Sequence, residues 1–109
     1  MNAVFEDFTK LDIRAGTIIA VDEFPEARKP AYKLTIDFGE LGVKKSSAQI
    51  TDLYSKEDLL NKQIVAVVNF PPKQVGPFIS ECLVLGSYSK DGVVILRTER
   101  PVLNGDKIG

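Results

Sequence analysis

The sequence contains no histidine, no tryptophan and only one cysteine, Cys82. Without histidine, the chain alone cannot build a Ser-His-Asp or Cys-His nucleophile system or a His-ligated zinc site. It also has no P-loop, no GxGxxG motif and no CxxC pair. Carboxylate chemistry remains possible, but no pair of acids stands out from the others. We therefore expect a binding protein without cofactor or metal, not an enzyme.

Long hydrophobic runs and leader-like segments are absent too. No segment approaches the roughly 18 consecutive apolar residues that a membrane helix needs, so we expect no membrane insertion. The first ten residues, MNAVFEDFTK, have neither the basic start nor the apolar run of a signal peptide. A single cysteine cannot form a disulfide within the chain, which agrees with a reducing compartment. With 109 residues, 44% of them hydrophobic, we expect one cytoplasmic domain spanning residues 1–109.

Charge is nearly balanced overall but unevenly distributed. The net charge is −1; residues 1–27 carry two basic and six acidic side chains, whereas residues 28–45 carry five basic and two acidic ones. Phosphate binding requires a local basic patch rather than a basic protein. The alternative is an ordinary mixed surface, which the net charge favours.

Short periodic segments separated by turn-forming residues predict a mostly β structure. Apolar residues at helical spacing predict a short helix over residues 3–11. Ser55, with Asp58 three residues later, predicts the capped start of a second short helix, and Asn61 suits its left-handed end. We expect strands over residues 13–24, 32–39, 43–51, 63–70, 80–88 and 93–98, a loop over 73–79, and an extended tail over 101–109 with a turn at Asn104-Gly105.

Residues 43–51, VKKSSAQIT, do not fit a simple strand, because both alternating rows are small or polar. Inward positions of a small barrel mix small and large residues. We therefore expect Ser46, Ala48 and Ile50 to face inward and the alternate row to face outward. An outer row that is polar and contains a lysine suits contacts to phosphate and sugar.

The order of elements predicts an all-β fold. Five to six strands with one short helix between the third and fourth are typical of the OB fold, a five-stranded Greek-key barrel. The N-terminal helix would precede this barrel. A β-sandwich is the alternative, but so few strands fit it less well.

Three segments in order, LDIRAGTI, KSSAQIT and NFPPKQVGPFISECLVLG, resemble the tRNA-binding domain family. This OB-fold module is appended to some aminoacyl-tRNA synthetases and also occurs as free-standing proteins. The resemblance covers essentially the whole chain, including the tail PVLNGDKIG, and is greatest to free-standing homodimers regarded as export-related chaperones. One departure is the loop at Gly76 and Pro77, where many tRNA-binding modules have a basic residue followed by glycine. The missing cation implies weaker RNA binding.

The resemblance and the strand pattern together give a candidate surface for tRNA or other structured RNA. Lys73 follows a pair of prolines in a loop where the resemblance implies nucleic-acid contact, and a solvated lysine is the alternative. For Arg14, an ion pair with Asp12 is at least as plausible as RNA contact. The absence of tryptophan favours recognition of shape and phosphate over base stacking. The predicted RNA-binding residues are Lys45, Ser47, Gln49, Lys73, Ser80, Lys44 and Arg14.

Apolar residues near the same loop suggest a second kind of partner. Phe70, Pro72 and Phe78 could form a rim that accepts an unfolded peptide or packs against a partner subunit. The resemblance implies a two-fold homodimer interface formed by the N-terminal helix and the C-terminal tail, at Phe5, Phe8, Pro101, Val102 and Ile108. The alternative is that both ends cap their own barrel. We therefore predict a chaperone for exported or unfolded polypeptides, with a tRNA-binding module as the alternative.

Overall fold

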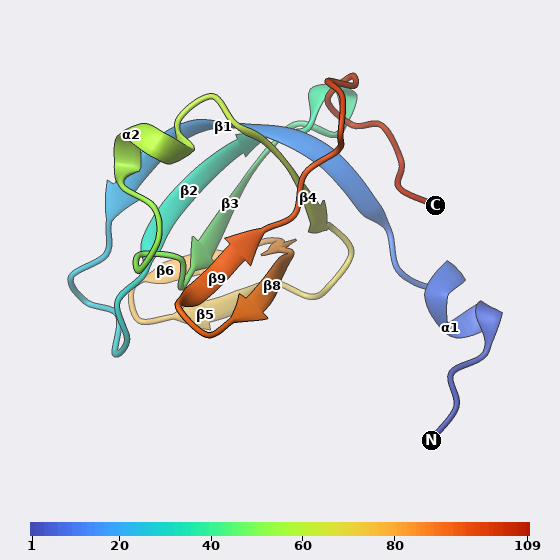
Figure 1. Ribbon diagram of the computed structural model, residues 1–109, viewed down its shortest axis with the longest axis horizontal. Helices are drawn as coiled ribbons and strands as arrows, with labels where there is room; N and C mark the ends of the chain where they lie inside the picture. The colour runs from blue at the N-terminus through green and yellow to red at the C-terminus, as the bar shows by residue number, and fades with distance from the viewer.

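The fold is a small antiparallel β-barrel. The computed structural model describes all 109 residues. A five-stranded sheet has the order β3-β2-β1-β4-β7 and is strongly curled (Figure 1), so that its two outer strands, β3 and β7, contact each other. Its members are β1 (Ile13–Glu23), β2 (Tyr32–Asp37), β3 (Val43–Ala48), β4 (Gln63–Val67) and β7 (Leu83–Val84). The predicted OB-type barrel is confirmed.

Strand β1 is long because it pairs with two neighbours in succession. Residues 13–17 pair with β4, residues 17–23 pair with β2, and a β-bulge lies between Ile18 and Ala20. Gly16 lies next to this change of partner, where a Cβ atom would come within 2.6 Å of the Phe38 ring. Glycine is therefore required there by close packing, in line with the bulge or bend that a glycine within a strand predicts.

The core lies inside the barrel and follows the predicted alternation. Leu34, Ile36 and Phe38 of the second strand segment are fully buried. From the third strand segment, Ser46, Ala48 and Ile50 are buried, while the alternate row is exposed or half-buried. The inward orientation predicted for VKKSSAQIT is confirmed. Ser46 is the one buried polar residue, and its hydroxyl donates to the Cys82 carbonyl oxygen at 2.9 Å.

Two short helices differ in how they are anchored. Helix α2 (Lys56–Leu59) closes one end of the barrel with Leu59 buried. It begins as predicted: the Asp58 amide donates to the Ser55 hydroxyl, and the Ser55 amide donates to the Asp58 carboxylate. Asn61, at φ 70°, ends it in the left-handed region. No helix is both long and apolar enough to cross a membrane.

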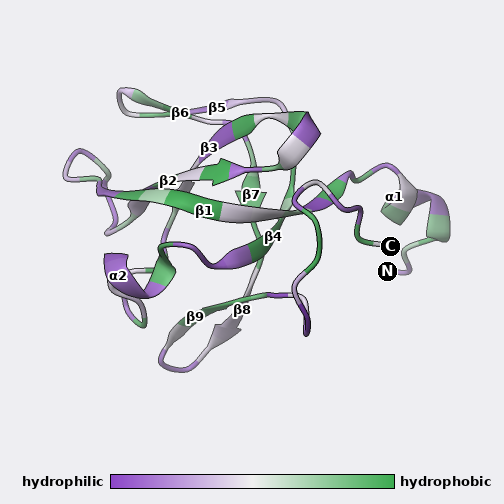
Figure 2. Cartoon of the chain, turned by 90° about the horizontal axis from the view of Figure 1, so that it is seen from above, coloured by the Kyte–Doolittle hydropathy of each residue, from purple (hydrophilic) through white to green (hydrophobic).

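Helix α1 (Phe5–Thr9) is shorter than the predicted span of residues 3–11, and none of its residues is buried. It stands away from the barrel (Figures 1 and 2). A helix of about one turn gains little from its own hydrogen bonds. The apolar spacing therefore does not ensure that the helix continues to Leu11.

Two segments differ from the sequence prediction. Residues 73–79 form a hairpin, β5 (Lys73–Val75) and β6 (Phe78–Ser80), rather than a loop. Gly76, at φ 57°, forms the tight turn of this hairpin. Glycine and proline at positions 76 and 77 predict a loop from the sequence alone. The predicted strand over 80–88 is divided among β6, β7 and β8 (Gly86–Ser89). It breaks at Leu85, whose amide donates to Val65 of β4 while its carbonyl accepts from Leu96 after β9.

The last two strands form a separate hairpin, and the tail packs against the barrel. Strand β9 (Gly92–Ile95) pairs with β8 around a two-residue turn. A short 3₁₀ helix (Gly39–Leu41) connects β2 to β3. The tail is extended, as predicted, and turns at Asn104-Gly105. It lies along the start of β1, where the Ile108 amide donates to the Ile13 carbonyl at 2.8 Å.

Candidate functional site

A groove of about 1480 Å³ lies beside the open seam of the barrel. Its walls come from five segments: the loop before β2, the end of β3 with the residues after it, Phe70-Pro71 after β4, the β5–β6 hairpin, and residues 81–88 with Val93 of β9. The two hairpins lie on opposite sides of the barrel in Figure 2. The groove is therefore open along the line where β3 and β7 separate.

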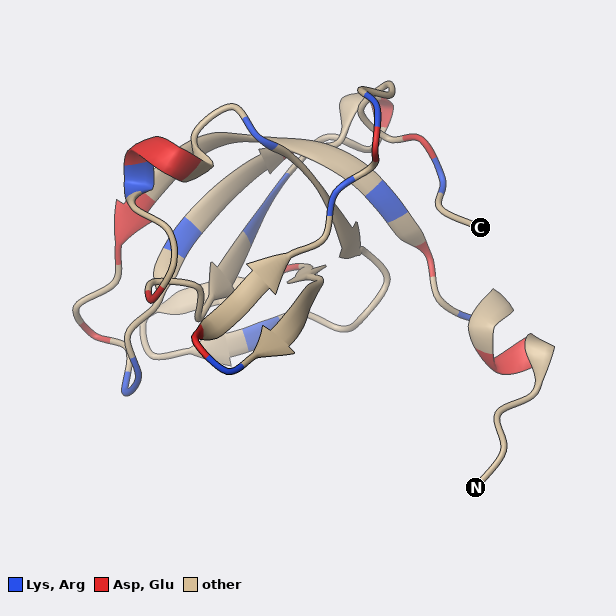
Figure 3. Cartoon of the chain, viewed as in Figure 1, with Lys and Arg blue, Asp and Glu red and all other residues tan.

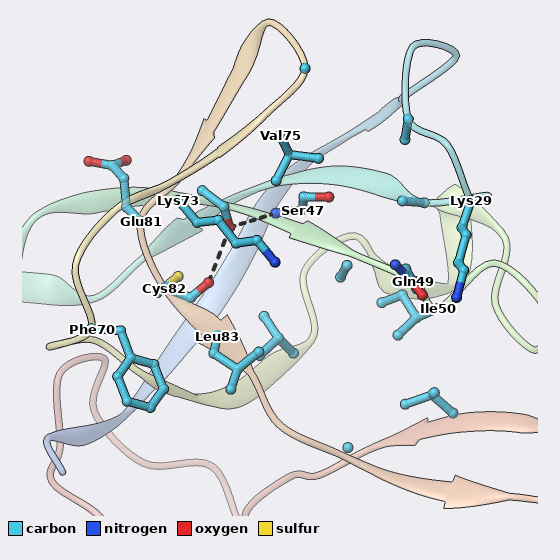
Figure 4. Close-up of a pocket in the computed structure, with 18 of the residues that line it drawn as sticks. Lys29, Ser47, Gln49, Ile50, Phe70, Lys73, Val75, Glu81, Cys82 and Leu83 are labelled. Carbon is cyan, nitrogen blue, oxygen red and sulfur yellow. Dashed lines mark hydrogen bonds between the residues drawn. The ribbon is translucent and has the colours of Figure 1, made fainter.

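Apolar side chains line the part of the groove drawn in Figure 4 around Leu83. Leu83 is 49% exposed, Phe70 44% and Tyr88 93%. Half of the lining residues are hydrophobic. Exposed apolar groups gathered in one hollow are typical of a binding site, whereas isolated ones are ordinary.

Polar residues fix one wall of the groove to β3. The Ser47 amide donates to the Ser80 hydroxyl at 3.1 Å, and the Lys45 amide donates to the Glu81 carboxylate at 2.9 Å. In return, the Glu81 amide donates to the Lys45 carbonyl at 2.7 Å. Ser80 and Glu81 therefore hold the hairpin against the barrel, in line with the sequence-based expectation that these two residues orient and cap this segment.

Basic residues flank the groove from two sides. Lys73 lies on β5, and Arg28 and Lys29 lie on the loop before β2; all three line it, together with the acids Glu26 and Glu81. Figure 3 shows basic residues on this loop and on β5, at the same end of the molecule. The sequence identified residues 28–45 as a basic segment, but it did not predict that Arg28 and Lys29 line a groove.

A second basic surface covers the outer face of β2 and β3. By register, Lys33 lies opposite Ser47 and Thr35 opposite Lys45, so these side chains share one face of the sheet. The Lys33 ammonium sits 5.5 Å from the centroid of the Phe24 ring. In the sequence, the alternation along β2 predicts that Lys33 faces outward, and this is the signal that could have placed it on the surface. Gln49, beyond the end of β3, lines the groove with Ser47.

The predicted peptide-binding residues are not brought together. Phe70 lines the groove, but Phe78 and Pro72 do not. The Phe78 ring instead packs edge to face on Phe24, with centroids 5.5 Å apart. That contact joins residues far apart in sequence, so local pattern could not reveal it. Leu83 and Tyr88, which the sequence did not single out, line the groove together with Phe70.

The remaining predicted RNA contacts lie outside the groove. The Arg14 guanidinium pairs with Asp12 at 2.6 Å and donates to the Gly105 carbonyl at 3.0 Å, which ties the tail to β1. This is the ion pair that the sequence offered as the alternative for Arg14. Lys44 lies opposite Ile36 near one end of the barrel, on the inward row of β3.

Cys82 lies in the groove wall with its thiol largely withdrawn from water. Burial raises the pKa of the Cys82 thiol to about 11, an effect that a hydrogen bond with Ser46 partly offsets. The nearby Glu81 charge raises this pKa further, and Lys44 lowers it. The thiol is therefore protonated at neutral pH and acts as a small apolar group in the wall.

The two ends of the chain present apolar side chains away from the groove. Phe5 is 74% exposed and Phe8 41%. Val102 is also exposed, and its carbonyl accepts from the Gln63 side chain. Pro101 is exposed as well, whereas Ile108 packs on its own barrel beside Ile13, Val65 and Val67.

A curled five-stranded antiparallel sheet with a half-apolar groove at its seam defines an OB-fold binding domain. Within this class, residues 13–107 match the model of the putative tRNA binding domain, and the chain belongs to that family.

Curated relatives and solved structures agree with this assignment. The chain is 36% identical over 104 residues to methionine–tRNA ligases of Thermococcus onnurineus and Pyrococcus horikoshii. These matches cover 95% of the chain but only 14% of each ligase. Two solved structures match at full length: chaperone CsaA of Bacillus anthracis, with TM-score 0.94 and 56% identity over 100% of both chains, and CsaA of Picrophilus torridus, with TM-score 0.95 and 55% identity over 99% and 100%.

Proposed function

We propose that this protein is a non-catalytic chaperone that holds unfolded or exported polypeptides in the groove, in the cytoplasm. The observation that carries the proposal is the cluster of exposed apolar side chains, Phe70, Leu83 and Tyr88, in one hollow of about 1480 Å³. The similarity to two CsaA chaperones over the full chain supports it. The proposal does not extend the activity of the methionine–tRNA ligases to this chain, which matches one seventh of their length.

Covering the apolar residues would supply useful binding energy. Burying an exposed leucine or phenylalanine side chain contributes about 1.5–3 kcal/mol. Phe70 and Leu83 are each about half exposed, so covering them should contribute about 1 kcal/mol apiece. Binding free energies of this modest size suit a chaperone that must later release the polypeptides it holds.

The test is suppression of aggregation. A denatured reporter protein is diluted from urea with and without the chaperone, and light scattering is followed. The double variant Phe70→Ser, Leu83→Ser should lose most of the suppression. The matched control is Ile79→Ser, since Ile79 is 52% exposed but lies outside the groove. Equal suppression by the double variant and the wild type would contradict the proposal.

A second candidate function is binding of tRNA or another structured RNA. The family assignment favours it, as does the outer face of β2 and β3, where Lys45 and Ser47 lie beside Lys33. We place the RNA contacts on Lys45, Ser47, Gln49 and Lys73. Ser80, Lys44 and Arg14 are less suited, because the first and last are committed to internal hydrogen bonds and Lys44 lies on the inward row.

The RNA proposal makes a prediction about salt. Labelled tRNA should bind at low salt and dissociate as salt rises, because lysines that neutralise phosphates release counterions. The variant Lys45→Glu, Lys73→Glu should abolish this binding. Lys90→Glu, in the β8–β9 turn and outside the groove lining, is the control. Binding that is independent of salt, or unaffected by the double reversal, would refute the assignment.

We also propose that the protein forms a homodimer through its two ends. Phe5 and Phe8 lie on a helix without any buried residue, and covering them requires another surface. Pro101 and Val102 are exposed and would contribute from the tail. Ile108 would hold the tail in place for this contact by packing on its own barrel.

A further inference from the structure

The barrel seam closes at one point and then opens. At the closed point, the Ser46 hydroxyl donates to the Cys82 carbonyl and the Glu81 amide donates to the Lys45 carbonyl. Beyond it, the chain after β3 continues along one wall of the groove, while β8 forms part of the other wall. The groove thus runs between two strand segments that are not paired with each other.

One edge of β8 faces no partner strand. Strand β8 pairs only with β9, and in an antiparallel pair alternate residues direct both main-chain groups to the partner. The Leu96 amide donates to the Leu85 carbonyl, and Ser89 and Gly92 flank the two-residue turn. Both features place Ser87 and Ser89, together with the carbonyl of Leu85, on the row bonded to β9.

The other row of β8 therefore presents its main chain to the groove. By this alternation, the amide and carbonyl groups of Gly86 and Tyr88 point away from β9. Gly86 and Tyr88 are also the two β8 residues that line the groove, whereas Ser87 and Ser89 do not. All four residues of β8 are exposed, so this edge of the strand is accessible to a ligand.

The opposite wall shows the same property at Ser47. The amides of Lys45 and Ser47 both point away from β2, since they donate to Glu81 and Ser80. By the same alternation, the Ser47 carbonyl is directed away from β2, and Ser47 lines the groove. Main-chain groups thus face the groove from both walls, with the apolar side chains of Leu83 and Phe70 in the lining.

We propose that the groove binds an extended polypeptide segment as an added strand along the free edge of β8. Gly86 and Tyr88 supply the main-chain hydrogen bonds, and alternate side chains of the segment pack on Leu83 and Phe70. Main-chain hydrogen bonds are available from any sequence, which suits a protein with many clients. The inference rests on the proposed chaperone function and specifies the conformation in which its clients are bound.

The test uses backbone methylation of a defined peptide. The probe is a labelled peptide of about eight residues, the length of an ordinary strand, with alternating leucine and threonine. Two derivatives carry N-methyl groups on two successive leucine amides or on two successive threonine amides. The leucine side chains of the peptide fix which of its faces is buried in the groove. The pairing register of the peptide with β8 can therefore shift only in steps of two residues. The same set of amides must therefore always face β8.

Fluorescence anisotropy should show a strong difference between the derivatives. One should bind more weakly by about fivefold for each lost hydrogen bond, and the other within about twofold of the parent peptide. Two protein variants test the same edge: Tyr88→Pro removes the side chain and the edge amide, while Tyr88→Ala removes the side chain alone. A proline is tolerated at an edge position that makes no ladder bond, so Tyr88→Pro should bind more weakly than Tyr88→Ala.

The outcomes separate this inference from the proposed function. If the parent peptide binds but both methylated forms bind equally well, strand addition is wrong and the chaperone proposal stands. If the parent peptide does not bind while labelled tRNA does, both proposals about polypeptide fall. Tyr88→Pro and Tyr88→Ala variants with equal affinity would also overturn the role of the β8 edge.

Discussion

Raising the pH should destabilise this protein through Cys82. Burial raises the pKa of the Cys82 thiol from its ordinary value near 9 to about 11. The folded protein therefore favours the protonated thiol, so its stability is unaffected below about pH 9 and falls as the pH rises toward about 11. One pKa unit corresponds to about 1.4 kcal/mol.

The expected magnitude follows from these two values. At about pH 10, Cys82 is mostly ionised in the unfolded chain but not in the folded protein. This difference lowers the free energy of unfolding by about 1.4 kcal/mol. Well above about pH 11 the loss approaches about 2.7 kcal/mol. Between pH 7 and 8 the same linkage contributes almost nothing.

Urea denaturation of the wild type and Cys82→Ala at about pH 8 and pH 10 measures this loss. The alanine variant is less stable at both values, because it leaves a small void. It also retains the other groups that titrate in this range, including Tyr32, whose pKa burial also raises. The wild type should lose about 1.4 kcal/mol more than the variant between the two pH values. Equal losses would mean that Cys82 is as accessible in the folded protein as in the unfolded chain.

Two further predictions concern the ends of the elements. Ser55→Ala should cost about 1 kcal/mol in urea denaturation, because it removes the helix cap. It should also raise the pKa of Asp58 in part, as NMR titration can detect: the Ser55 backbone amide, the larger cause of the lowered pKa, remains, whereas the hydroxyl is lost. An unchanged Asp58 titration would contradict the capping geometry. Phe5→Glu with Phe8→Glu should convert the proposed dimer to monomer in sedimentation velocity while leaving the barrel folded by circular dichroism. A variant that sediments like the wild type would refute this interface.

Much of the barrel could be predicted because its signals are local. The alternation of Leu34 and Ile36 with polar neighbours, and the pairing of Ser55 with Asp58, reflect contacts within a strand or a helix turn. The β5–β6 hairpin was missed because Gly76 next to Pro77 reads as a loop. In the structure these residues pair as two strands, and the Ser47 amide donates to Ser80 across the seam, a contact between segments far apart in the sequence.

The candidate site was harder to predict, because its members come from distant segments. Lys73 and Gln49 were found from their position in a motif and in an alternating row. Leu83 and Tyr88 were not, since an apolar residue in a strand gives no sign that it is exposed. Phe78 was assigned to the groove from sequence proximity to Lys73, whereas its ring packs on Phe24.

The proposed polypeptide and RNA sites overlap only in part. The apolar part of the groove is formed by Leu83, Phe70 and Tyr88, whereas Lys45 and Lys33 lie on the outer face of β2 and β3, outside the groove lining. Three of the proposed RNA contacts, Lys73, Ser47 and Gln49, line the groove, so both ligands would meet there, and Lys73 is the charged one. A bound RNA that reaches Lys73 would narrow access to Ser47 and thus hinder a client strand. Competition should then depend on Lys73, and Lys45→Glu should weaken RNA binding without affecting peptide affinity.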